Sequence, residues 1–162
     1  MKSVELLAPA GNMIALHAAV SAGADAVYLG ASSFNARRSA DNFTLETLRE
    51  ACDYAHLRGV KVYLTVNTII LPSELYDAIE LVRQAYRAGV DAFIVQDLGL
   101  AQEIARTIPQ TRVHISTQMN THTKDALLAE AALGAKRVTL ARELSLTEVA
   151  DLSHFAAELG ME

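Results

Sequence analysis

The chain has 162 residues, of which 51% are hydrophobic, and it carries one cysteine and a formal net charge of −5. This length fits one domain with a sizeable core, and the acidic balance argues mildly against a surface that coats nucleic acid, while leaving open an RNA held by a few residues. One cysteine excludes an internal disulfide framework, and without an apolar signal region or a membrane-length run we expect a cytoplasmic protein with no membrane partner.

The predicted elements alternate strictly between strand and helix. In chain order they are a strand at 4–8, a helix ending at Gly23, a strand at 26–29, a helix at 44–58, a strand at 61–66, a helix from Pro72 to Gly89, a strand at 92–95, a helix at 99–108, a strand at 112–116, a helix at 123–133, a strand at 137–140 and a helix from Ser145 to Gly160. Six βα units in series predict a parallel sheet with crossover helices.

Glycine closes five of the helical stretches, and after four of them a β-rich run begins at once. Glycine suits a helix C-terminus because it accepts the left-handed conformation without a Cβ clash. The five are Gly23, Gly59, Gly89, Gly134 and Gly160. After the last one only two residues follow, where a seventh strand would begin. We therefore expect residues 1–162 to be a single domain that forms the N-terminal fragment of a TIM-barrel-like domain.

Two parallel architectures compete, and alternation along the strands separates them. In the strand at 61–66, apolar Val62, Leu64 and Val66 alternate with Tyr63 and Thr65, which are polar or amphipathic. The strand at 112–116 alternates in the same way. A doubly wound sheet needs two apolar faces on its central strands, whereas a barrel has one face against helices and one facing inward. We therefore favour an α/β fold with six parallel βα units in sequential strand order, forming an incomplete (β/α)8 barrel.

Polar side chains gather where the predicted strands end, which is where active sites of parallel α/β folds lie. Amides with one or two charges suit a peptide-like or small anionic ligand. The ligand-facing candidates are Asn67, Gln96, Asp97, Gln118, Arg142 and Glu143, with Asn12, Arg37 and Arg38 as weaker members. No nucleophile–base pair stands out among them, so the catalytic residues stay unassigned.

Several of these residues have a second interpretation. Asp97 could be a general base or the cap of the helix that follows it. The arginines at 37 and 38 could clamp an anion or lie in a solvated loop, and the pair at 142–143 could serve the site or a helix start. His114 should point into the barrel, as a core or a catalytic histidine. Cys52 lies on an apolar helical stripe and is expected to be a core thiol; with His56 it gives too few ligands for a metal site.

Several segments together resemble the start of the collagenase-like U32 peptidase family. They are Leu6-Leu7-Ala8-Pro9-Ala10-Gly11, the segment at 23–30, Asn42-Phe43-Thr44, Ser116-Thr117-Gln118 and Ala141-Arg142-Glu143-Leu144-Ser145. The resemblance implies the N-terminal part of a TIM-barrel-like domain, which would hydrolyse peptides in the full-length protein. As an alternative it implies hydroxylation of tRNA or rRNA bases with prephenate and an iron–sulfur cluster. A ligand-binding barrel without catalysis is a further alternative.

The family's cluster-binding cysteines have no counterpart here, so no cofactor is expected within this fragment and the fragment alone is expected to be inactive. RNA would then be a partner of the full-length protein only. An open barrel also leaves the edges of its first and sixth strands unpaired. Leu146, Val149 and Leu152 should face neighbours that are partly missing, so we expect self-association through the open edge.

Overall fold

The computed structural model describes residues 4–36 and 42–162, and its elements alternate as expected. The strands are β1 (Leu7–Pro9), β2 (Ala26–Gly30), β3 (Lys61–Val66), β4 (Ala92–Val95), β5 (Val113–Ile115) and β6 (Arg137–Val138). The helices are α1 (Met13–Ser21), α2 (Leu45–His56), α3 (Leu75–Ala88), α4 (Leu98–Thr107), α5 (Lys124–Ala132) and α6 (Leu146–Glu158), with a short 3-10 turn, η1 (Thr117–Met119), after β5.

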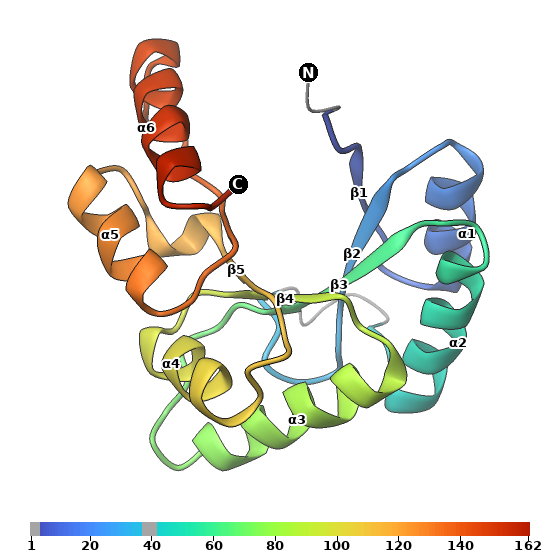
Figure 1. The fold of residues 1–162 in the computed structure, drawn as a ribbon. Helices are drawn as coiled ribbons and strands as arrows, with labels where there is room; N and C mark the ends of the chain where they lie inside the picture. Colours follow the sequence, from blue (N-terminus) through green and yellow to red (C-terminus); the bar gives the residue numbers. More distant parts are fainter. Residues whose placement is uncertain (1–3, 37–41) are drawn as a thin grey trace.

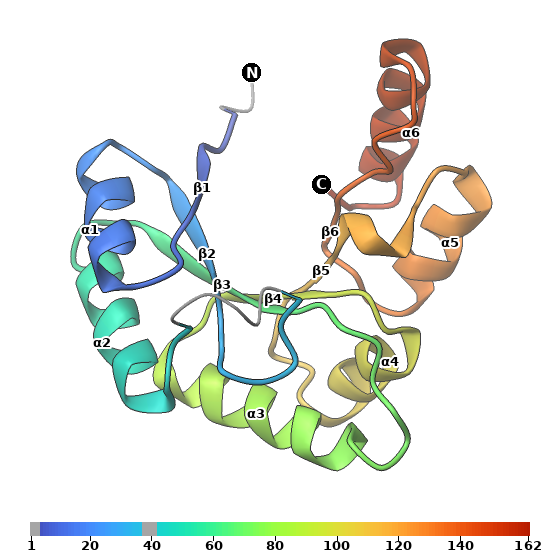
Figure 2. The same ribbon diagram turned by 180° about the vertical axis from the view of Figure 1, so that it is seen from behind.

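The strands form one parallel sheet in the order β1-β2-β3-β4-β5-β6. The sheet curves, and the helices lie along its outer, convex side, while the N- and C-terminal ends flank the open side (Figures 1 and 2). This sequential order confirms the incomplete barrel. A doubly wound sheet would instead place the first strand in the middle.

The two faces of the strands have different surroundings, as the alternation predicted. Val62, Leu64 and Val66 are fully buried in the core between sheet and helices. Tyr63 belongs to a separate small cluster with Ala26 and Ala92 on the concave face of the sheet. The concave face is therefore lined by side chains of mixed polarity, as in a barrel whose interior is partly polar.

Local signals placed the helix starts well, with one exception. Thr44 with Thr47 and Ser145 with Glu148 each form a reciprocal capping box. The prediction that Pro72 opens a helix was wrong, because α3 begins only at Leu75. Residues 72–74 form a turn instead, in which the Leu71 backbone N–H donates to the Glu74 carboxylate at 3.0 Å.

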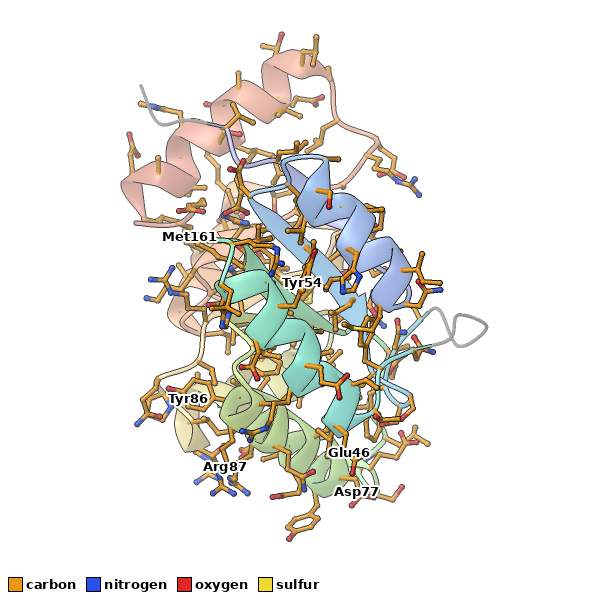
Figure 3. The ribbon with its side chains drawn as sticks, turned by 90° about the vertical axis from the view of Figure 1, so that its right-hand side faces the viewer. Glu46, Tyr54, Asp77, Tyr86, Arg87 and Met161 are labelled. Carbon is orange, nitrogen blue, oxygen red and sulfur yellow. The ribbon has the colours of Figure 1, made fainter. Side chains whose placement is uncertain are left out.

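Successive helices pack side by side around the barrel. In Figure 3, Glu46 and Asp77 mark the first turns of α2 and α3 at the same end, while Tyr86 and Arg87 mark the far end of α3. Tyr54 of α2 contacts His17 of α1, with ring centroids 4.1 Å apart. Helices α2 and α3 thus begin at the same end of the barrel, where the carboxyl ends of the strands also lie.

All five closing glycines adopt the predicted left-handed conformation, but their surroundings differ. Gly59 has a φ of +74° and open space around it, whereas Gly89 has a φ of +110° and lies against α2. A Cβ built on Gly89 would meet the Cys52 Cβ at 3.1 Å, a buried atom that cannot move freely. Glycine at position 89 therefore permits both the left-handed backbone conformation and the close packing against α2.

We predict that Gly89→Ala lowers the free energy of unfolding by about 2 kcal/mol, because it adds a core contact to the conformational cost. Gly59→Ala should cost only about 1 kcal/mol, because it carries the conformational cost alone. Urea denaturation of both variants tests this difference. Equal losses for the two would show that the contact with Cys52 is relieved without cost.

The outer edge of β6 is partly covered, which corrects the expectation of a fully unpaired sixth strand. The Val138 backbone N–H donates to the carbonyl of Glu162 at 2.8 Å, and the Glu162 N–H donates to the carbonyl of Lys136 at 3.0 Å. On α6, Leu152 is buried but Leu146 is 89% exposed. Self-association through the open side of the barrel stays a prediction.

Candidate functional site

A pocket of about 300 Å³ lies at the carboxyl ends of the strands, the mouth of the barrel, and we call it the mouth pocket. All of the described side chains that line it are uncharged, and hydroxyl and amide groups are prominent among them. They are Leu7, Pro9, Ala10, Gly11, Tyr28, Leu29, Gly30, Asn35, Asn42, Thr65, Asn67, Ile94, Ser116, Thr117 and Thr139. The lining therefore suits a small neutral group with hydrogen-bonding edges.

The loop between β2 and α2 contributes a buried asparagine to this pocket. Asn35 is 4% exposed, its Nδ2 donates to Asn42 Oδ1 at 2.7 Å, and its Oδ1 accepts from the Thr65 hydroxyl at 3.3 Å. Phe34 and Asn42 on either side of it have positive φ angles of 57° and 27°. Such backbone conformations are costly and persist where the surroundings enforce them. The loop is thus held in a strained shape that seats Asn35 in the mouth.

The end of β3 contributes two polar side chains that face the pocket. The Thr65 hydroxyl lies 3.0 Å from the carbonyl oxygen of Leu29, which it can reach as a donor. Beyond the end of the strand, Asn67 Oδ1 accepts a hydrogen bond from the Ala36 backbone N–H at 3.3 Å. The loop after β2 and the end of β3 are therefore joined by hydrogen bonds across the pocket wall.

The β5 side of the pocket carries hydroxyl groups. Ser116 is 3% exposed, and its Oγ accepts from the Gln118 backbone N–H at 3.3 Å, which caps η1. The Thr117 hydroxyl donates to the carbonyl of Leu140 at 3.3 Å. These hydroxyls contact backbone groups, so they anchor the loops while still facing the cavity.

Of the predicted ligand-facing residues, Asn67 alone lines the mouth pocket as the described residues define it. Asn12 caps α1 by accepting from the Ala15 N–H at 2.9 Å. Asp97 caps α4 at the Leu100 N–H, 2.8 Å, and also accepts from the Ile70 N–H at 3.2 Å. Asp97 is therefore a helix cap, which is the second of the two interpretations that the sequence allowed.

The remaining candidates lie around the mouth without lining the pocket. Gln96 is half-buried just beyond β4, Gln118 is exposed in η1, and Arg142 and Glu143 are exposed in the turn before α6. The arginines at 37 and 38 lie outside the described residues.

Sequence reasoning missed most of the polar lining. Inward alternation had already pointed to Thr65 and to the position of Ser116, although neither was chosen as a site residue. No local pattern marked Asn35 or Asn42, because their role depends on contacts with each other and with Thr65 of β3. Thr139 follows a strand that proved to be only two residues long.

At the opposite end of the barrel, an ion-pair network joins the segment just before β1 to β6; we call it the floor network. Arg137 on β6 donates to Glu5 at 2.5 Å and also pairs with Glu162, and the Tyr63 hydroxyl donates to Glu5 at 2.9 Å. Burial opposes ionisation of Glu5, but hydrogen bonds from Arg137 and Tyr63 outweigh it and lower the pKa of Glu5. Burial and the Glu5 hydrogen bond raise the pKa of Tyr63 to about 12.

His114 points inward, as predicted, and packs edge-on against Tyr63 with ring centroids 4.8 Å apart. It is 6% exposed, and burial together with the charge of Arg137 lowers its pKa to about 4. A neutral histidine packed against the floor network fits the core interpretation of this residue.

Cys52 is a core thiol, as expected. It is 1% exposed, and burial raises its pKa to about 12, so the reactive thiolate is strongly disfavoured. His56 lies one turn further along α2 and contacts the Asp91 carboxylate at 2.9 Å. Across residues 4–36 and 42–162, no group of three or more histidine, cysteine or acidic side chains is arranged to hold a metal ion.

Glu130 on α5 is a buried acid near the mouth loops. It is 3% exposed, and its Oε1 accepts from the Thr121 hydroxyl at 2.5 Å, while its Oε2 has no hydrogen-bond partner within the described part of the chain. Burial raises the pKa of Glu130, and the bond from Thr121 offsets only part of that shift. The carboxyl group is therefore biased toward its neutral form.

We expect Glu130→Gln to flatten the pH dependence of stability. Because the folded pKa lies above the unfolded one, the contribution of Glu130 is complete below the ordinary value of 4.5 and is lost as pH rises through the folded pKa. Glutamine cannot ionise, so the wild type should lose stability relative to the variant from pH 4 to pH 8. Urea denaturation at both pH values tests this, with exposed Glu158→Gln as control. Parallel pH profiles for wild type and Glu130→Gln would contradict the prediction.

The curved sheet of six parallel βα units, with a polar pocket at the carboxyl ends of its strands, places the protein in the TIM-barrel class. The family model of peptidase family U32 matches residues 11–162. The chain therefore belongs to peptidase family U32. The structure of the U32 peptidase Mk0906 has the same fold, with a TM-score of 0.65 at 16% identity over 85% of this chain and 58% of that one.

Curated relatives carry two kinds of name. The tRNA hydroxylation protein P of Helicobacter pylori J99 is 41% identical over all of this chain and 39% of its own length. The 23S rRNA 5-hydroxycytidine C2501 synthase of Escherichia coli K12 is 38% identical over 90% and 22%, respectively. The collagenase of Porphyromonas gingivalis W83 is 40% identical over 90% and 34%. The chain thus spans at most 39% of the length of these relatives.

No helix among the described residues is long and apolar enough to cross a membrane.

Proposed function

We propose that this chain forms the first part of the barrel of an RNA-base hydroxylation protein, and that the mouth pocket receives the base. The observation that carries this proposal is that the described residues lining the pocket, within 4–36 and 42–162, are uncharged and rich in hydrogen-bonding groups. At about 300 Å³ it lies at the small end of ligand pockets, so it suits one ring system rather than a peptide segment. Enzymes that modify bases hold the extruded base by hydrogen bonds to its edge and by stacking on apolar or aromatic side chains.

The hydroxyl groups of the pocket support this proposal over peptide hydrolysis. A serine or threonine nucleophile needs a general base that takes its proton. The Thr117 hydroxyl donates to a backbone carbonyl, and the Thr65 hydroxyl contacts the Leu29 carbonyl and Asn35. His114, the histidine of β5, packs at the barrel floor and not beside Ser116. The pocket is built for binding a neutral group more than for activating a nucleophile.

The names of the relatives favour the same proposal. Hydroxylation of tRNA or rRNA is named for the relatives from Helicobacter pylori and Escherichia coli. Peptide hydrolysis, which the family name first suggested, stays as a second candidate because the Porphyromonas gingivalis collagenase is of comparable similarity.

An iron–sulfur cluster, which the resemblance implied for the hydroxylation proteins, does not fit the residues of this chain. Such clusters are held by several cysteine thiolates, usually four. The chain has one cysteine, and it is buried in the core with a raised pKa. A cluster would have to be held by residues outside this chain.

Deletion of the gene in the source organism tests the proposal. Nucleosides from digested tRNA and rRNA should then lack one hydroxylated base, and the intact gene should restore it. Unchanged nucleosides, together with peptide hydrolysis by the purified full-length protein, would support the second candidate instead. Unchanged nucleosides without hydrolysis would leave a ligand-binding barrel and also contradict the proposal.

A further inference from the structure

The orientation of the Asn67 amide is fixed by its neighbour. A backbone N–H can only donate a hydrogen bond, so the Asn67 atom that contacts the Ala36 N–H at 3.3 Å must be the carbonyl oxygen Oδ1. The amide therefore turns its Nδ2 group away from the loop after β2. Within residues 4–36 and 42–162, that Nδ2 group has no hydrogen-bond partner, although Asn67 lines the mouth pocket.

A second donor lies at the same level of the barrel. Val66 of β3 pairs with Val95 of β4, which pairs with Ile115 of β5, so these three residues are level across the sheet. Asn67 and Ser116 follow the outer two of them directly, and both line the pocket. Because Ser116 Oγ accepts from a backbone N–H, its own proton is free to be donated. The wall formed by the ends of β3 and β5 thus offers donors.

Asn35 has a different role in the same pocket. Its amide nitrogen donates to Asn42 and its amide oxygen accepts from Thr65, so it holds the β2–α2 loop against the barrel. That loop carries Ala36, the group that orients Asn67. Asn35 is therefore a positioning residue, while Asn67 lines the pocket and keeps a donor that no described residue uses.

We propose that Asn67 is a specificity-determining residue whose Nδ2 group donates to the carbonyl oxygen at C4 of the bound ring, the position at which uracil and cytosine differ. The inference rests on the proposed function and deepens it, because it selects bases by the carbonyl groups on their edges. A site built to donate to a ligand discriminates strongly against one that presents another donor at that place, since both donors are then left unpaired.

The variant Asn67→Asp distinguishes a role of Asn67 in ligand recognition from a role in holding the loop. A carboxylate still accepts from the Ala36 N–H, so the loop contact is kept, but the donor facing the pocket becomes an acceptor. The matched control is Asn12→Asp, at the same end of the barrel. Asn12 also accepts from a backbone N–H, at 2.9 Å, and does not line the pocket. Aspartate caps helices as well as asparagine does, so this control should preserve the fold.

The readout is the affinity of the full-length protein for uridine 5′-monophosphate and for cytidine 5′-monophosphate, measured by NMR titration. Uracil has two ring carbonyls, whereas cytosine has one carbonyl and one amino group. Asn67→Asp should weaken binding of the uridine nucleotide about tenfold or more and shift preference toward the cytidine nucleotide. Asn12→Asp should leave both affinities unchanged.

The outcomes separate the two proposals. Unchanged affinities and an unchanged preference in Asn67→Asp, with nucleotide binding by the wild type intact, would overturn the role of Asn67 and leave the base pocket standing. A wild type that binds neither nucleotide would overturn both. A general loss of binding without a change in preference would assign Asn67 a structural role and contradict the proposal.

Discussion

Gly30→Ala is expected to dislodge Asn35 and destabilise the protein by about 3 kcal/mol. A Cβ built on Gly30 would lie 1.9 Å from Asn35 Nδ2 and 2.5 Å from its Cγ, so both groups cannot occupy this space. Asn35 is 4% exposed and would lose its hydrogen bonds to Asn42 and Thr65 on leaving. The released loop would also cease to orient Asn67, so the hydroxylation that we propose for the full-length protein should fall sharply in this variant.

Urea denaturation measures the stability part of this prediction. Gly11→Ala is its control for folding, because an added methyl group there meets nothing within 4 Å. The decisive comparison is the double variant Gly30→Ala with Asn35→Ala, which removes the clash. It should be less destabilised than the sum of the two single changes. Strict additivity would mean that the contact between Gly30 and Asn35 does not determine the loop position.

Arg137→Ala should lower the free energy of unfolding at pH 7 by about 3 kcal/mol, because it leaves the Glu5 carboxylate without its closest cation. The side chains of Arg137 and Glu5 are 22% and 21% exposed, so water can only partly replace the lost contact. Glu5 and Arg137 lie 132 positions apart in sequence, and their ion pair joins the segment before β1 to β6. The loss should therefore be global and not confined to one helix.

The effect of Arg137→Ala should shrink in acid. The folded pKa of Glu5 is lowered, so its pairing stabilises the protein above the unfolded pKa and is lost as pH falls through the folded value. Thermal unfolding at pH 7 and at pH 3 tests this dependence. The control is Arg106→Ala, whose pair with Glu103 is an exposed i,i+3 contact and should contribute little to stability. Equal losses for both arginines would show that the floor network is no more than a surface contact.

The fold could be predicted because its determinants are local. Left-handed glycines such as Gly59 and Gly89, capping residues such as Thr44 and Ser145, and period-two alternation in β3 each depend on a few neighbouring residues. Strict alternation of strand and helix then restricts the topology to a few parallel arrangements. The polar inward face of β3 then favoured a barrel over a doubly wound sheet.

The candidate site was only partly predictable, because backbone position does not fix what a side chain contacts. Asn67, Asp97 and Asn12 all follow strand ends, as the sequence indicated. The side chains of Asp97 and Asn12 cap helix N-termini, whose unpaired N–H groups donate to nearby oxygen acceptors. Asn67 was left facing the pocket.

By itself, the sequence determined the order of the strands, the faces they bury and the end of the barrel where polar groups gather, because these follow from short-range periodicity and turn chemistry. Tertiary structure alone decided that Asn35 enters the mouth and that Glu5 meets Arg137 at the floor. Both depend on chain curvature that brings distant segments together. Local sequence patterns carry no information about such contacts, because these form only when the whole sheet curves.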